Sequence, residues 1–219
     1  MKIQWLGHAA FLITTGEGLK ILMDPYQAGG YGGAIGYGKI ELAPDIVTIS
    51  HDQHEDHNAT GSLKGNPVIV KTPGKEKIRG VVINRVQTFH DNSGGSERGP
   101  NLVIGLEADG LRVVHCGDLG HVLTSEQVAA IGPVDVLLVP IGGTFTLDAG
   151  EADAVVAQLK PKIVVPMHYK TAKCGFPLLH VEDFLKGKKR VKKLSGSTLE
   201  VNAGALPAET EIVVLEHAL

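Results

Sequence analysis

The residues with the clearest chemical potential lie between positions 51 and 57. This segment is HDQHEDH, so three histidines and three acidic residues fall within seven positions. It directly follows residues 45–50, DIVTIS, a short apolar and β-branched run that predicts a strand. Imidazole and carboxylate groups together are ligands for zinc, iron or manganese. A strand end holds the following loop in place, so several side chains of the loop can face one point. The segment therefore predicts a metal site. The alternative from these residues alone is a histidine-rich surface loop.

Further histidine and aspartate residues follow apolar runs elsewhere in the chain. Each occupies a position where a predicted strand ends, which is where a sheet presents its reactive groups. A single histidine in such a place is usually structural, but several of them together with segment 51–57 favour one shared site. These residues are His8, His90, Asp118 and His168.

Apolar runs between turn residues predict the elements that would position these side chains. The glycine-rich residues 29–38 predict a loop that could fold over the site and bring Tyr31, Tyr37 or Lys39 to a substrate. The order of elements predicts one mixed α and β domain over residues 1–219. Strands are expected at 2–6, 10–14, 19–23, 45–50, 67–71, 81–88, 102–108, 111–116, 134–140 and 163–166. Helices are expected at 125–131, 149–159 and 181–185, and a closing hairpin at 198–201 and 211–215.

Composition excludes several classes of protein. The 219 residues are 43% hydrophobic and 21% charged, which is ordinary globular usage and excludes a wholly disordered chain. A net charge of −3 gives no basic field for nucleic acid, and no apolar run is long enough to span a membrane. Two cysteines and an N-terminus without a signal-peptide pattern predict a cytoplasmic protein. The basic run at residues 186–193 is interpreted as a solvated helix end and turn.

Taken together, these motifs resemble the metallo-β-lactamase superfamily. In that family an H-x-H-x-D-H segment after a strand is followed by a single histidine, a bridging aspartate and a last histidine. The flanking motifs look like its branch of uncharacterised metal-dependent hydrolases, which is similar to the L-ascorbate-6-phosphate lactonases. The resemblance implies a four-layer αββα sandwich with the site at one edge of two sheets. The matching segments are WLGH at 5–8, DPY at 24–26, FHD at 89–91, RGPN at 98–101, GDLGH at 117–121, GGTFTLD at 142–148 and PMHY at 166–169.

The resemblance implies a two-metal ligand set in which Asp118 bridges the ions. The sequence departs from the family pattern at one point, because the position two before His54 is Asp52 and the nearest histidine, His51, lies three before it. Either His51 binds through a bulged loop, or Asp52 binds, or another group such as His8 completes the first site. We favour His51, because Ser50-His51 follows the strand directly. The implied ligands are His51, His54, Asp56, His57, His90, Asp118 and His168.

The implied function is that of a metal-dependent hydrolase in which a metal-bound hydroxide cleaves a small ester, lactone or phosphoester. Asp56 would orient the water and carry a proton, while His8 and His121 would assist the ligands. Zinc is the expected metal, with up to two ions per chain, and Mn²⁺, Ni²⁺ and Fe²⁺ stay open. The expected partner is a small-molecule substrate, with neither nucleic acid nor membrane, and a homo-oligomer stays open.

Two other functions fit the same ligands. One is a metal-binding pseudo-enzyme or sensor without turnover, which the irregular spacing around Asp52 motivates. The other is a di-iron redox site, because carboxylate-rich ligand sets suit iron. Metal analysis combined with a hydrolase screen would separate the three.

Overall fold

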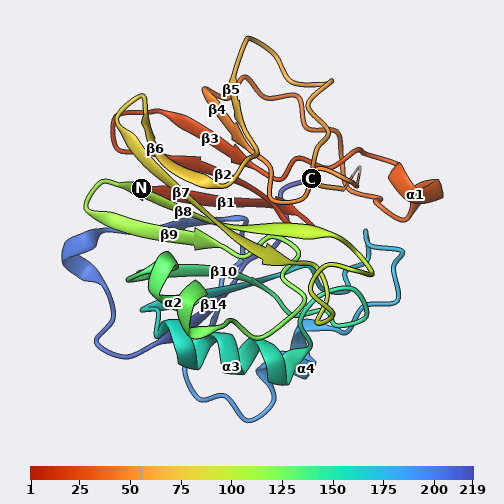
Figure 1. Cartoon of the computed structure of the whole chain (residues 1–219), viewed down its shortest axis with the longest axis vertical. Coiled ribbons are helices and arrows are strands. Elements are labelled where there is room, and N and C mark those ends of the chain that lie inside the picture. The colour runs from red at the N-terminus through yellow and green to blue at the C-terminus, as the bar shows by residue number, and fades with distance from the viewer. Residues whose placement is uncertain (55) are drawn as a thin grey trace.

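Two β-sheets packed against each other form the centre of the molecule (Figure 1). The structure is a computed structural model, and it describes residues 1–54 and 56–219. The first sheet has the strand order β13 (Thr198–Glu200), β1 (Lys2–Gly7), β2 (Ala10–Thr14), β3 (Lys20–Met23), β4 (Ile46–Thr48) and β5 (Val68–Val70). The second has the order β12 (Val191–Lys193), β14 (Glu211–Val214), β11 (Ile163–Met167), β10 (Val136–Pro140), β9 (Leu111–His115), β8 (Pro100–Ala108), β7 (Val81–Phe89) and β6 (Gly74–Ile78).

The first sheet is apolar on both faces, because successive side chains of a strand point to opposite sides. In β2, Phe11 and Ile13 join the core between the sheets, whereas Ala10 and Leu12 join a second apolar cluster on the outer face. This outer cluster is closed by Ile35, Tyr37, Ile40 and other side chains of the loop that follows β3. That loop contains only the four-residue helix α1 (Gly30–Gly33), so mostly irregular chain covers this face.

Helices cover the outer face of the second sheet. The helices α2 (Ser125–Ile131), α3 (Ala149–Leu159) and α4 (Val181–Leu185) lie together on this side (Figure 1). Thr124 begins α2 and Asp148 begins α3, each in a capping box that satisfies free backbone N–H groups. From α3, Ala152, Val155 and Leu159 point into the core, as the helical spacing predicts. The described residues include no helix that is long and apolar enough to cross a membrane.

The predicted closing hairpin is wrong. β13 pairs antiparallel with β1 in the first sheet, whereas β14 runs parallel to β11 and β12 in the second. The connection with the short 3₁₀ helix Ala203–Ala205 therefore carries the chain from one sheet to the other. Two strands were also not expected, β6 in a polar segment and β12 inside the basic run at 186–193.

The strands that precede the candidate ligands end at one edge of the two sheets. β1 and β4 lead to His8 and His51 from the first sheet. β7, β9 and β11 lead to His90, Asp118 and His168 from the second. The mixed α and β fold with two packed sheets expected from the sequence is confirmed, and the fourth layer of the expected αββα sandwich, over the first sheet, is mostly irregular chain with the short helix α1.

Candidate metal centre

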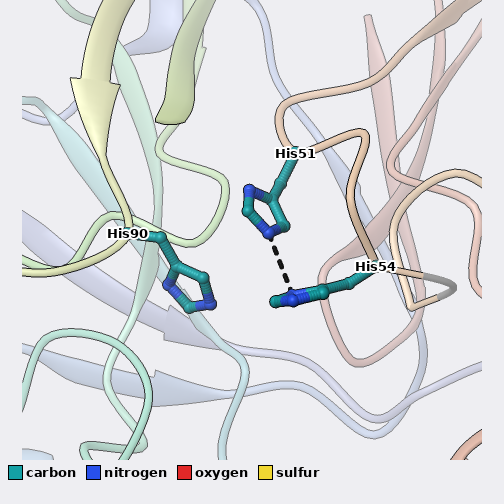
Figure 2. A group of neighbouring side chains, drawn as sticks. All are labelled: His51, His54 and His90. Atoms are coloured by element: carbon teal, nitrogen blue, oxygen red, sulfur yellow. Dashed lines mark hydrogen bonds between the residues drawn. The ribbon is translucent and has the colours of Figure 1, made fainter. Parts of the chain in front are cut away.

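Three imidazoles form the first ligand group. Figure 2 shows that His51 and His54, from the loop after β4, and His90, from the end of β7, turn their rings toward one another. One ring nitrogen from each residue lies within 4.8 Å of the others. His51 Nδ1 donates to the carbonyl of Pro100 at 2.7 Å, which leaves Nε2 to face His54 Nδ1 at 2.9 Å. A fixed Nδ1–H is the usual way to aim the other ring nitrogen at a metal.

Asp52 lies away from this group. Its carboxylate contacts Lys71 Nζ at 2.8 Å, and 48% of its side chain is exposed. The extra residue between His51 and His54, relative to the family pattern, is thus taken up in the loop, and His51 rather than Asp52 faces His90.

The roles of these two residues can be separated by mutation. His51→Ala removes a ring that faces the site. Loss of a residue that only supports a ligand lowers metal affinity roughly 10–100-fold, so this variant is expected to lower metal affinity by at least as much. Asp52→Ala removes only an exposed ion pair, a contribution of about 0–1 kcal/mol to stability, and should leave metal content unchanged. Metal content per chain and affinity, measured for both variants, test this. The reverse result would assign the ligand to Asp52, and equal negligible effects would exclude both.

Two carboxylates and three histidines form the second group. Asp118 Oδ1 lies 2.9 Å from His57 Nε2 and 3.4 Å from His168 Nε2. Asp56 Oδ1 lies 3.1 Å from His57 Nδ1, and its other oxygen lies 3.5 Å from His8 Nε2. The His8 ring is fully buried, with its centroid 4.1 Å from that of His168. His8 is therefore part of this group and not of the one that contains His51.

Asp118 touches both groups with different oxygens. While Oδ1 faces His57 and His168, Oδ2 lies 3.3 Å from His90 Nε2 in the first group. The carboxylate is 1% exposed. Its position between two ligand groups is the one that a bridging carboxylate requires.

The buried donor atoms fit a metal ion. Among the described residues, ring nitrogens of His8, His57, His90 and His168 and Oδ1 of Asp118 are buried without a well-formed hydrogen bond. Buried polar groups are normally paired, and leaving one unpaired costs about 1–3 kcal/mol. Nitrogen and carboxylate oxygen are ligands of zinc and of other divalent transition metals, so binding such an ion would satisfy Asp118 Oδ1 and the ring nitrogens that face it.

The electrostatics of the site also fit a cation. Burial alone would raise the pKa of Asp118, but His57, His168 and His90 outweigh burial and hold that pKa well below its usual value. Burial lowers the pKa of His51 and of His90, and burial with the neighbouring His8 lowers that of His168 to about 3. The carboxylate is therefore ionised and these imidazoles are neutral, which are the forms that bind metal.

Two imidazoles are exceptions: burial opposes the charge of His8, but Asp56 and Cys174 raise its pKa above the usual value, and His57 is the second. Burial opposes its charge, but Asp118 and Asp56 raise its pKa well above the usual value. Its proton therefore balances two buried carboxylates, at the place where a metal ion would provide the positive charge.

Neighbouring residues fix the loops that carry the ligands. Asp24 accepts a hydrogen bond from the backbone N–H of Ser50 at 2.7 Å, which anchors the end of the metal-binding strand. Asn101 Oδ1 accepts from the N–H of Asp118 at 2.9 Å. Gly117 has φ +57°, and a Cβ there would collide with Ser50, so the sequence Gly117-Asp118 allows this close approach. Asp24 and Asn101 lie in the DPY and RGPN motifs, but no chemical role was predicted for them.

His8 and His168 both have left-handed backbone conformations, with φ of 51° and 52°. The N–H of His168 donates to the carbonyl of His8 at 3.2 Å, and the indole of Trp5 donates to the same carbonyl at 3.0 Å. Non-glycine residues in this region are strained and concentrate at functional sites. The strain here turns two imidazoles toward Asp56.

His121 lies outside both groups. Its Nε2 accepts from the backbone N–H of Phe89 at 3.2 Å, and its Nδ1 lies 2.9 Å from the carbonyl of Val122. It therefore supports the turn before His90, and its assisting role stays a prediction. Glu55, the remaining acidic residue of segment 51–57, lies outside the described residues.

Comparison with known proteins agrees with this geometry. The model of a family described as a beta-lactamase superfamily domain matches residues 2–168. The chain belongs to the metallo-β-lactamase superfamily. The matched segment contains all the candidate ligands, from His8 to His168.

Relatives within the superfamily carry the name UPF0173 metal-dependent hydrolase. The relative from Carboxydothermus hydrogenoformans is 35% identical over 199 residues, covering 78% of this chain and 85% of that protein. The relative from Pyrobaculum islandicum is 35% identical over 223 residues, covering 89% and 93%.

A solved superfamily structure from Thermotoga maritima has the same fold. It has been proposed as a Zn-dependent hydrolase, is 41% identical, and superposes with a TM-score of 0.82 over 98% of each chain. The relationship therefore extends over nearly the whole molecule, beyond the residues at the metal centre.

Proposed function

We propose that this chain is a hydrolase that uses two divalent metal ions, with zinc as the expected metal, to cleave a small ester, lactone or phosphoester. The observation that carries the proposal is the position of Asp118, whose two oxygens face two separate groups of candidate ligands. His51, His54 and His90 would hold one ion, and Asp56, His57 and His168 with Asp118 would hold the other. The relatives named metal-dependent hydrolases support the same class of reaction.

Divalent ions bound there would supply Lewis acidity, lowering the pKa of water and polarising the oxygen of a scissile group. The protein supplies the orientation. Asp56 lies in the wall of a cavity and is held by His8 and by His57. Burial would raise its pKa, but His57 and His8 hold it far below the usual range, so the carboxylate is ionised. It can accept a hydrogen bond from the attacking water and take its proton.

Removing metal should abolish turnover and lower the melting temperature. Without a cation, the buried imidazoles and carboxylates stay incompletely paired. An ion that binds only the folded state, at a free concentration of 100 times its Kd, adds about 2.7 kcal/mol to the free energy of unfolding. The measurement is thermal unfolding and metal content before chelation, after chelation and after readdition of Zn²⁺ or Mn²⁺. An apo-protein as stable as the metal-loaded form would contradict this.

The test of function is a panel of esters, lactones, phosphomonoesters and phosphodiesters, assayed on the same metal-analysed sample. Turnover that depends on bound metal supports the proposal. Bound metal with no turnover across the panel would favour a binding protein, and redox-active iron would favour a di-iron centre.

A further inference from the structure

A cavity of about 120 Å³ opens onto both ligand groups. Five of the described residues that line it are the candidate ligands His54, Asp56, His90, Asp118 and His168. The other three are aromatic, Tyr31, Phe145 and Phe176, and form the aromatic wall of the cavity. A substrate placed at the metal centre would thus have its reacting group against the ligands and the rest of its structure against these rings.

The three rings come from different loops and pack on one another. Phe176 is central, with its centroid 5.3 Å from that of Tyr31 and 5.6 Å from that of Phe145, both at steep angles. It also lies 5.9 Å from the ring of His8. The Tyr31 hydroxyl donates to Asp56 Oδ1 at 3.4 Å, which links the aromatic wall to the ligand wall. The contacts of Phe176 with Tyr31 and Phe145 are edge-to-face arrangements that fix the orientation of each ring.

Backbone hydrogen bonds hold the loops of Tyr31 and Phe176 together. The N–H of Gly36 donates to the carbonyl of Lys173 at 2.8 Å, and the N–H of Gly175 donates to the carbonyl of Ala34 at 2.7 Å. Between these bonds, Ile35 and Cys174 form an isolated antiparallel bridge. The aromatic wall is therefore already ordered, so a ligand that contacts it does not have to order the loops on binding.

The lining of the cavity offers few positively charged groups to an anionic substrate. None of the described residues that line the cavity is a lysine or an arginine. Two cations lie near the rings but are engaged. Lys170 Nζ donates to the carbonyl of Phe176 at 2.9 Å, and the Arg98 guanidinium lies 5.9 Å over the Phe145 ring and contacts the carbonyl of Thr144 at 3.4 Å. Besides metal ions, phosphate recognition usually relies on such cations or on exposed backbone N–H groups, and the described lining of this cavity offers no lysine or arginine for it.

We infer that the substrate is a carboxylic ester or lactone with a compact aromatic group, and that Phe145 and Phe176, with Tyr31, select for that group. The inference rests on the proposed function. It narrows the substrate class to carboxylic esters and lactones and makes phosphoesters the least favoured of the proposed substrates. In the reaction, the oxygen of water bonds to the acyl carbon, the acyl carbon–oxygen bond to the alcohol breaks, and the alcohol leaves with a proton. The cavity of about 120 Å³ is smaller than the apolar cavities of about 150 Å³ that enclose benzene, so it admits at most a single ring, part of which would extend through its opening.

Binding of three small anions tests the selection without requiring turnover. Benzoate and acetate share the carboxylate that would face the metals and differ by the ring, whereas inorganic phosphate has no apolar part. Calorimetry on the zinc-loaded protein should show benzoate binding at least about tenfold more tightly than acetate, as is usual for an added apolar group in a fitted pocket. Phe176→Ala and Phe145→Ala should remove most of this difference while leaving acetate affinity unchanged.

Leu179→Ala is the matched control. Leu179 is an apolar side chain on the same segment as Phe176, is 41% exposed, and is not one of the residues that line the cavity. It should keep the full preference for benzoate. Circular dichroism of each variant shows that the fold is retained, and Phe176→Leu replaces any alanine variant that does not fold. Equal affinity for benzoate and acetate in the wild type, or tighter binding of phosphate than of benzoate, would overturn the inference.

A turnover assay separates this inference from the proposed function. Phenyl acetate and methyl benzoate are compared with methyl acetate and with a phosphodiester on the same metal-loaded sample. A kcat/KM at least about tenfold higher for the aromatic esters, lost in Phe176→Ala, supports the inference. Metal-dependent hydrolysis of all esters at equal kcat/KM would overturn the inference but keep the function. If nothing is hydrolysed, the function fails, and the anion affinities still decide whether the wall selects an aromatic group.

Discussion

Asp118→Asn should reduce turnover by about 10³-fold or more, because each metal ion contributes several kcal/mol of transition-state stabilisation and each 1.4 kcal/mol corresponds to a factor of ten. The change preserves the size of the side chain but removes the negative charge that faces His57, His168 and His90. An amide offers one oxygen and cannot serve both groups equally. We therefore expect the variant to lose at least one of two bound ions, as measured by elemental analysis and turnover on one sample.

The control for Asp118→Asn is the same substitution at Asp52. That carboxylate contacts Lys71 at the surface, so its neutralisation should change neither metal content nor rate. If Asp118→Asn retained both ions and the wild-type rate, Asp118 would not bridge metals, and the two ligand groups would have to act separately.

Asp56→Asn is expected to lower the rate by the roughly 10²–10⁴-fold typical of a lost general base, even when both metal sites are full. The carboxylate is ionised, is held by His8 and His57, and lines the cavity in which water would attack. The experiment measures turnover at saturating metal and metal content on the same sample. It separates proton transfer from metal binding, because excess metal can restore a weakened site but cannot restore a missing base.

Two outcomes of the Asp56→Asn experiment would change the mechanism. Recovery of most of the rate on addition of metal would reduce Asp56 to a ligand. Near wild-type turnover in a fully metallated variant would remove it from the chemistry. Tyr31→Phe on the same substrate tests whether the hydroxyl that contacts Asp56 Oδ1 contributes, and we expect a smaller effect from it.

The sequence could place the candidate ligands together because the segments that carry them follow predicted strands, and their role as ligands stays a prediction. Strand ends can be recognised from apolar runs, and strands that run in the same direction end at the same edge of a sheet. Residues such as His90 and His168 could therefore be placed together without knowledge of the packing. The distinction between His51 and Asp52 needed coordinates, because a loop can take up one extra residue in several ways and its sequence does not show which.

Other features had no local signal. β6 is almost wholly exposed at the edge of its sheet, so its side chains need no apolar alternation. β12 is an edge strand rich in charged residues. Such a composition discourages pairing with the edges of other molecules, but in the sequence it resembles that of a solvent-exposed turn. Whether β13 and β14 join the same sheet depends on which sheet has a free edge near each strand. That arrangement belongs to the tertiary structure and leaves no local sequence pattern. Phe145 and Phe176 come together only through the packing of separate loops.

The ligands of each proposed ion come from both sheets. His51 and His54 follow β4 of the first sheet while His90 follows β7 of the second, and Asp56 and His57 face Asp118 and His168 in the same way. A bound ion would therefore cross-link the sandwich, as a disulfide does between distant parts of a chain. Because segments from His8 to His168 must already be assembled to present these atoms, metal capture would come at the end of folding. Loss of the ion would first loosen the edge of the sandwich where substrate enters.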